Sequence, residues 1–205
     1  MKRINELLAA AAVLMAGGSV QASLDIPNGN PVGVASSMQV VGQSGISMMS
    51  VTLNISGGNN GDLYAYLSYD GAVVTLLNRP GVTGSNPIGS TAAGYSSVLV
   101  EDGAAMSLNS ATAAAGSPVA TGTYYASDGS AALLGAYGSD SGNGLWTLFV
   151  ADLSGGGTEG DSQLNSWILN INGVNVPEPI TWGLVAFGGG VLLVTLSRRL
   201  WKRTA

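Results

Sequence analysis

The stretch VTLNISGGNNGDLYAYLSYDGAVVTLLNRPG, residues 51–81, alternates short apolar segments with turn-forming residues. Apolar side chains stand at every second position in two of its segments: Val51, Leu53 and Ile55, then Leu63, Ala65 and Leu67. Glycine, asparagine and aspartate gather between the segments, at 57–62, 69–71 and 78–81. An alternation of period two between glycine-rich turns is typical of antiparallel β-strands that bury one face.

The same pattern continues on both sides of this stretch, where WTLFV (146–150) and WILNI (167–171) each place a tryptophan on an apolar face. Residues 83–120 are rich in Ala, Ser and Gly and are expected to be mainly loop. Strands are expected at 38–41, 46–55, 62–68, 73–77, 97–100, 146–152 and 167–171. The predicted fold class is all-β, an antiparallel β-sandwich.

The charge of the chain narrows the classes of partner. Between residues 23 and 176 the sequence has one basic residue, Arg79, and ten acidic residues, a formal charge of −9. Such a surface repels phosphate backbones, so the sequence argues against nucleic acid as a partner, whereas divalent cations fit it. The chain has no His and no Cys, which excludes Ser-His-Asp and Cys-His relays and the usual zinc sites.

The N-terminus has the layout of a secretory signal peptide. Basic residues at 2–3 precede an apolar segment at 7–18 that is too short to span a bilayer, and small residues end at Ala22. Residues 1–22 are therefore the predicted signal peptide, with cleavage between Ala22 and Ser23. A buried N-terminal helix is the alternative.

The C-terminus has three parts. Pro177, Glu178 and Pro179 form a stiff extended element, and an uncharged segment at 180–196 follows. As a helix that segment would be roughly 25 Å long, slightly short of a bilayer core. The basic cluster that closes the chain comprises Arg198, Arg199, Lys202 and Arg203. We therefore expect a transmembrane helix with a basic tail over 180–205 and a cytoplasmic C-terminus.

The order of these parts resembles the PEP-CTERM sorting signal of Gram-negative bacteria, over residues 176–201. Gly188, Gly189 and Gly190 weaken the helix and are not needed by a permanent anchor. The resemblance implies export across the inner membrane, recognition by an exosortase-type enzyme and removal of the tail near 177–179. A simple tail anchor is the alternative.

The body resembles the P-domain of proprotein convertases (P/Homo B) over about residues 25–173. The resemblance rests on IPNGNPVGVASSMQVVG near the start, on the opening stretch with Gly-Asp-Leu at 61–63, and on GLWTL and LNSW near the end. It implies a jelly-roll-like sandwich at 23–173, with 174–179 as linker and sorting motif. The His-Thr pair that many members carry is absent, and no protease domain lies between the signal peptide and the body. The resemblance therefore implies architecture and brings no protease activity.

Aromatic residues of the second segment are candidates for recognition. Tyr64 and Tyr66 oppose the apolar face, and with Tyr69 they form a candidate ligand-facing strip. Exposed aromatic residues that support cross-strand pairs are the alternative. Trp146 and Trp167 are instead expected in the core.

The loop ADLSGGGTEGDSQL places Asp152, Glu159 and Asp161 among glycines. Hard oxygen ligands at this spacing suit Ca²⁺, the only cofactor that the sequence suggests. The loop lacks an EF-hand register, and a solvated acidic loop is the alternative. Asp62 is expected to cap its turn rather than bind metal.

These features together predict a non-enzymatic exported protein of the cell surface or extracellular matrix, acting in adhesion or matrix scaffolding. Its expected partners are the export machinery, the processing enzyme, the inner membrane in transit, and extracellular polysaccharide or surface proteins. One alternative is a carbohydrate- or protein-binding accessory module of a separate exported enzyme. Another is a carboxylate-based glycoside hydrolase using Glu101, Asp102 or Glu159, a candidate by residue type alone.

Overall fold

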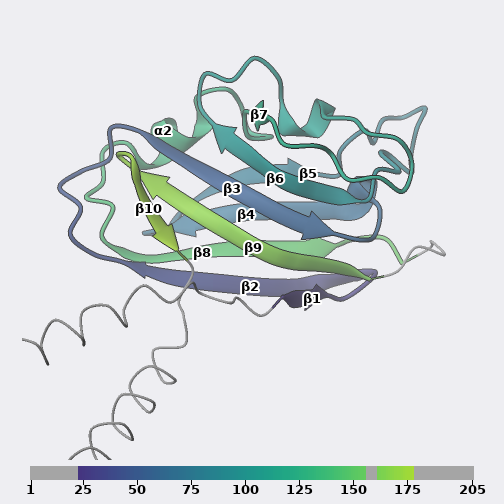
Figure 1. Cartoon of the computed structure of the whole chain (residues 1–205), viewed down its shortest axis with the longest axis horizontal. Coiled ribbons are helices and arrows are strands. Elements are labelled where there is room, and N and C mark those ends of the chain that lie inside the picture. Colours follow the sequence, from purple (N-terminus) through teal and green to yellow (C-terminus); the bar gives the residue numbers. More distant parts are fainter. Residues whose placement is uncertain (1–22, 156–160, 178–205) are drawn as a thin grey trace, which may run out of the picture.

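A computed structural model describes residues 23–155 and 161–177 of the chain, which form two β-sheets packed face to face. Figure 1 shows the larger sheet in front, with β3, β6 and β9, and the smaller sheet behind it. The all-β sandwich predicted from the sequence is confirmed. The strands are β1 (Leu24–Ile26), β2 (Asn30–Val40), β3 (Met49–Ser56), β4 (Leu63–Tyr69), β5 (Ala72–Asn78), β6 (Gly94–Glu101), β7 (Thr123–Tyr124), β8 (Gly144–Asp152), β9 (Ser162–Ile171) and β10 (Val174–Pro177).

The strand order joins parts of the chain that are far apart in sequence. The larger sheet has the order β1-β9-β3-β6-β7, with β10 also paired to β9, and the smaller sheet has the order β2-β8-β4-β5. All the pairings are antiparallel except that of β6 with β7. Three short helical turns lie in the connections: η1 (Asn60–Asp62), η2 (Leu108–Ser110) and α2 (Ala132–Tyr137).

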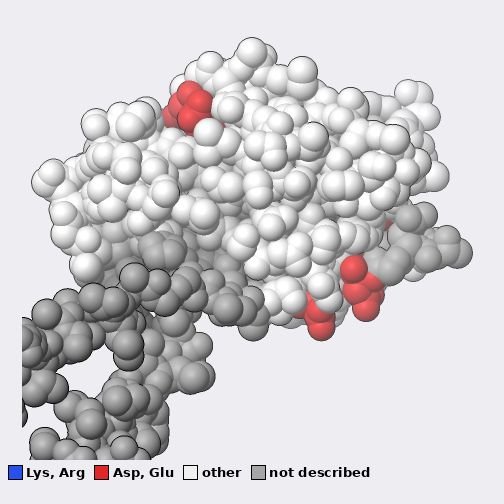
Figure 2. All heavy atoms as spheres, viewed as in Figure 1, with Lys and Arg blue, Asp and Glu red and all other residues white. Residues whose placement is uncertain are grey.

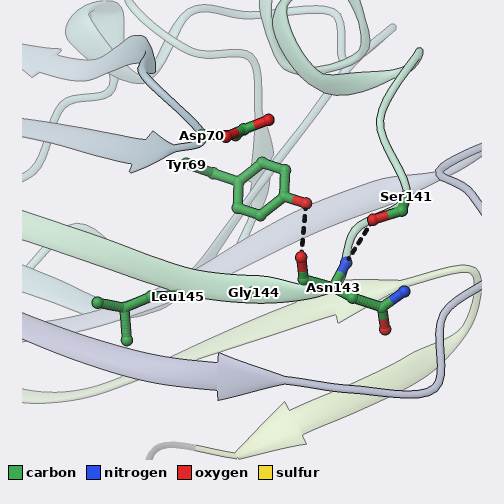
Figure 3. A pocket seen from close by; sticks show the side chains of 6 residues that line it. All are labelled: Tyr69, Asp70, Ser141, Asn143, Gly144 and Leu145. Atoms are coloured by element: carbon green, nitrogen blue, oxygen red, sulfur yellow. Dashed lines mark hydrogen bonds between the residues drawn. The ribbon is translucent and has the colours of Figure 1, made fainter.

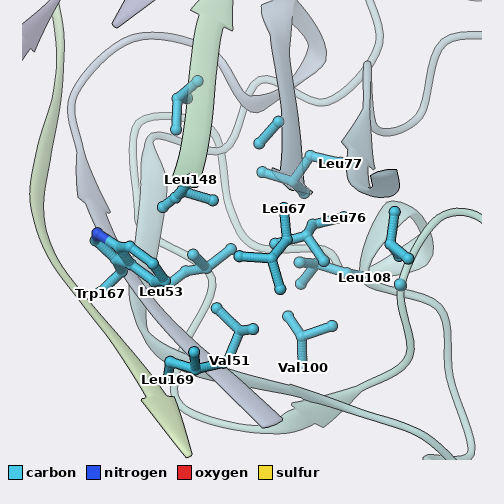
Figure 4. Close-up of a cluster of buried hydrophobic side chains, with 14 of the residues drawn as sticks. Val51, Leu53, Leu67, Leu76, Leu77, Val100, Leu108, Leu148, Trp167 and Leu169 are labelled. Carbon is cyan, nitrogen blue, oxygen red and sulfur yellow. The ribbon is translucent and has the colours of Figure 1, made fainter. Parts of the chain in front are cut away.

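The sandwich interior is built from the alternating apolar positions. Side chains from β3 and β4 meet there, and the six apolar residues that define the pattern in 51–67 are each at most 1% exposed. Trp146 and Trp167 are also fully buried, so their expected core role is confirmed. Each indole N–H has an acceptor: Trp146 Nε1 donates to the Gly142 carbonyl at 3.1 Å and Trp167 Nε1 to Ser36 Oγ at 2.9 Å. Figure 4 shows how leucine and valine side chains from both sheets fill the space between them.

The end of the body differs from the expectation. Residues 174–177, expected to belong to a linker, form strand β10 and pair with β9. Asn172 and Gly173 connect the two strands with φ values of 53° and 81°. An Asn-Gly pair with positive φ at both positions makes a two-residue hairpin turn, so the chain folds back onto the sheet before the sorting motif. Pro177 is thus the last residue of the strand.

Neither predicted terminal segment falls in the described part of the chain. Between residues 23 and 177, omitting 156–160, no helix is long and apolar enough to cross a bilayer. The predicted signal peptide with Ala22, the remaining sorting residues Glu178 and Pro179, and the predicted transmembrane helix with its basic cluster lie outside the described residues.

Candidate binding surfaces

An aromatic row crosses the outer face of the smaller sheet. Tyr66 of β4 stacks on Phe149 of β8, with ring centroids 4.8 Å apart and planes 18° apart. Tyr64 meets Tyr66 edge to face at 6.2 Å. All three rings are partly exposed. Phe149 extends a row that the sequence analysis limited to tyrosines, although the alternation in WTLFV already placed it opposite the buried Trp146.

A glycine in the neighbouring strand leaves room for the Phe149 ring. Gly33 of β2 has φ of 54°, at the irregularity in the pairing of β2 with β8. A Cβ atom on Gly33 would lie 2.8 Å from Phe149 Cζ and would also overlap the carbonyl oxygen of Val150. The ring thus covers a backbone position that only glycine can fill without displacement.

The rest of this outer face is uncharged and mixes polar side chains with exposed apolar ones. Asp152 is the only charged residue in the four strands of the smaller sheet, and it is 3% exposed. Ser37 and Thr147 share a hydrogen bond of 2.8 Å across β2 and β8. The polar strand positions that share the face with the aromatic row are Ser37, Gln39, Thr147, Ser68, Thr75 and Asn78. Leu145 and Val73, which are 59% and 53% exposed, share it as well. Aromatic rings beside hydroxyl and amide groups are the combination that stacks on and hydrogen-bonds to sugars.

The opposite face of the sandwich is similar in charge. Figure 2 shows the larger sheet from outside as almost wholly uncharged, with acidic side chains only near its margins and no basic side chain in view. Asn170 and Asn175 join β9 and β10 there through a side-chain hydrogen bond of 2.7 Å.

Tyr69, the third expected member of the strip, lies in the core, so its expected place was wrong. It is 5% exposed and stacks on Trp146 with centroids 4.1 Å apart and planes 5° apart. Positions 63, 65, 67 and 69 of one strand share a face, which turns Tyr69 inward while Tyr64 and Tyr66 point out. The expected strip of three therefore reduces to these two tyrosines, joined by Phe149.

A hollow beside Tyr69 is lined also by Asp70, Ser141, Asn143, Gly144 and Leu145, and several of its polar groups are paired. Figure 3 shows the Tyr69 hydroxyl donating to the Asn143 carbonyl, at 2.8 Å, and Ser141 Oγ accepting from the Asn143 amide, at 3.2 Å. The Asn143 side chain also bonds the backbone of Gln43 in both directions, at 2.8 and 2.6 Å. These bonds join the connection at 41–48 to the connection at 138–143, so they hold two loops together beside the hollow.

The expected metal ligands do not meet within the described residues. Asp152 is buried and faces Asp62, Asp161 is exposed, and Glu159 lies outside the described residues. No group of three or more Asp, Glu, His or Cys side chains capable of holding a metal occurs in residues 23–155 and 161–177. Burial, followed by repulsion from Asp152, raises the pKa of Asp62, while Arg79 acts in the opposite direction.

Asp102, a candidate catalytic acid of a hydrolase, has a structural role. Asp102 accepts hydrogen bonds from the backbone N–H groups of Leu133 and Leu134, at 3.1 and 2.7 Å. It thereby caps the first turn of α2, whose N–H groups have no partner inside the helix. Glu101, its neighbour, ends β6 opposite Ser50 and is partly exposed.

No protein-family model matches this sequence, and the searches of curated proteins and of solved structures gave no match either. The resemblances to P-domains and to PEP-CTERM signals therefore stay predictions.

Proposed function

We propose that this chain is an exported, non-enzymatic protein of the cell surface or extracellular matrix that acts in adhesion or matrix scaffolding. It would reach that place by a signal peptide and a PEP-CTERM tag, and its body would be a P-domain-like jelly roll. The observation that carries the proposal is the nearly uncharged exterior of a well-packed sandwich, which holds for the strands of the smaller sheet and for the face of the larger sheet in Figure 2.

An exterior of this kind suits contact with hydrated, neutral polymers. Binding to it buries few charges, and burying an unpaired charge is the largest cost that a polar interface can meet. Hydroxyl and amide side chains can exchange hydrogen bonds with water for hydrogen bonds with sugar hydroxyls at little net cost. Many weak contacts over a flat face would then favour scaffolding over tight binding of a small ligand.

The aromatic row favours a second candidate, a carbohydrate-binding accessory module of a separate exported enzyme. Tyr64, Tyr66 and Phe149 present partly exposed aromatic rings on one side of the sheet, and such rings are apolar surfaces against which a sugar ring can pack. Several stacked residues of one glycan chain would be needed for measurable affinity.

Affinity electrophoresis of the mature protein in gels containing neutral polysaccharides tests both candidates. We expect retardation by at least one polysaccharide, and Tyr66→Ala should abolish most of it if the row is the contact. Tyr125→Ala, another partly exposed tyrosine away from the row, is the matched control. If both variants are retarded equally, the aromatic row is not the contact with the polysaccharide. If no polysaccharide changes the mobility of the wild-type protein, polysaccharide is not the partner.

A further inference from the structure

Two buried carboxylates meet at the end of the sandwich where β8 ends and β4 begins. Asp62 is 7% exposed and Asp152 is 3% exposed. Their backbones are held together, because Leu63 pairs with Asp152 and the Leu153 N–H donates to the Asp62 carbonyl at 2.8 Å. The two residues are ninety positions apart in sequence but neighbours in the fold.

One guanidinium does not balance this pair. Arg79 Nη2 lies 3.9 Å from Asp62 Oδ1, a long separation for an ion pair. The same side chain donates to the backbone carbonyls of Gly61 and Pro87, at 3.2 and 3.5 Å. With both acids ionised, two largely buried negative charges face one partly exposed positive charge, which is an unfavourable arrangement.

The side chain of Asn59 is an independent indication that this corner binds a ligand. Asn59 is 8% exposed, and its amide donates to the Asp62 carboxylate. Its Oδ1 atom is buried and has no hydrogen-bond partner among the described residues. A buried carbonyl oxygen without a donor is rare in a folded protein and calls for an explanation. A second buried polar atom without a partner among the described residues, Ser162 Oγ, lies beside Gly58, the residue before Asn59.

Asp152 has oxygen capacity to spare as well. From the described residues it accepts hydrogen bonds at Oδ1 only, from the N–H groups of Ser154 at 3.1 Å and Gly29 at 3.4 Å. The Ser154 side chain hydrogen-bonds to the Asp62 carboxylate. The corner therefore gathers two carboxylates, an amide oxygen and a hydroxyl, which are hard oxygen ligands, and offers no nitrogen or sulfur ligand.

We propose that Asp62, Asp152 and Asn59 bind a divalent cation, Ca²⁺. Calcium accepts oxygen ligands in irregular geometry and completes its shell with water and backbone carbonyls, whereas Mg²⁺ demands a regular octahedron. This ligand set differs from the one that the sequence predicts, since it replaces the loop acids by Asp62 and Asn59 and keeps only Asp152. With two carboxylates and a nearby guanidinium, the affinity belongs to the weak range of extracellular modules, a Kd of about 10⁻⁴ to 10⁻³ M.

The test is calorimetric titration of the full-length chain in detergent with CaCl₂, after treatment with a chelator. We expect one ion per chain and a Tm that rises with Ca²⁺ concentration. Asp62→Asn and Asp152→Asn should each abolish the heat and the Tm rise, while Asp70→Asn, an exposed acid in a turn, should leave both unchanged. Circular dichroism shows which variants keep the fold.

A gain-of-function variant keeps the proposal testable if an acid variant fails to fold. Asn59→Asp adds a third carboxylate, so it should tighten Ca²⁺ binding by about tenfold while lowering the Tm of the calcium-free chain. The proposal is overturned if the wild-type chain gives no heat and no Tm rise. It is also overturned if the folded Asp62→Asn or Asp152→Asn chain, or Asn59→Asp, binds Ca²⁺ as the wild type does, because the ion then lies elsewhere.

Discussion

Replacing Gly33 by alanine tests how the smaller sheet holds its aromatic row. The new Cβ would lie 2.8 Å from both Phe149 Cζ and Ala151 Cβ, and the residue would have to keep φ at 54°. The left-handed backbone costs an alanine about 1–2 kcal/mol. Displacing the packed ring and strand adds about 1–3 kcal/mol. We therefore expect Gly33→Ala to lower the free energy of unfolding by about 2–5 kcal/mol.

Gly71→Ala is the matched control, because Gly71 has φ of 82° and no atom within 4 Å of the added Cβ. It should lose only the backbone part, about 1–2 kcal/mol. Urea unfolding of the mature protein, followed by tryptophan fluorescence, measures both values, since Trp146 and Trp167 are fully buried. Equal losses in the two variants would refute the reasoning that Phe149 and the β8 backbone leave no room for a side chain at Gly33.

Three other substitutions test single contacts. Burial and the Asp152 carboxylate raise the pKa of Asp62 above 3.8, so the native state holds this proton more tightly than the unfolded chain and loses stability as the pH rises through the raised value. We therefore compare the Tm of Asp62→Asn with that of the wild type, both in chelator. The difference, variant minus wild type, should become more positive from about pH 4 to pH 7, and a difference that falls over this range would contradict a raised pKa of Asp62. Asn60 is fully buried and bonds Gly94 twice, as acceptor at 2.7 Å and as donor at 3.0 Å. Asn60→Ala removes the acceptor of the buried Gly94 N–H, while the Gly94 carbonyl keeps the Val119 N–H at 3.0 Å, so the loss in urea unfolding should be about 1–3 kcal/mol. A loss below about 0.5 kcal/mol would contradict this. Asp102→Ala removes the cap of α2 and should cost about 0.5–2 kcal/mol, whereas Glu101→Ala should change the unfolding midpoint little; the reverse order would show that the cap is unimportant.

The sequence predicted the sandwich because period-two alternation and glycine-rich turns are local signals. The strands around Val51, Leu63 and Trp146 could be recognised from a few residues each. Strand β10 had a local signal too, the Asn-Gly pair at 172–173, but the proline-rich segment that follows favoured a linker. Strand β1 has only three residues, too few for a periodic pattern.

The candidate sites were harder to predict, because they depend on pairings between distant strands. Phe149 joins Tyr66 only through the pairing of β8 with β4, and Asp152 meets Asp62 only through the same pairing. Tyr69 was expected at the surface because it was grouped with its tyrosine neighbours, although its odd position in the strand turns it inward. A single sequence gives the face of each residue more readily than the strand beside it.

The most direct test of the proposed function is the mass and location of the mature protein in its native host, compared with a strain that makes Glu178→Ala. The account predicts a wild-type chain that begins at Ser23, ends near Pro179 and is found outside the cell, with the variant retained in the inner membrane. A wild-type chain that still carries Arg198 to Arg203 and stays in the membrane would contradict it.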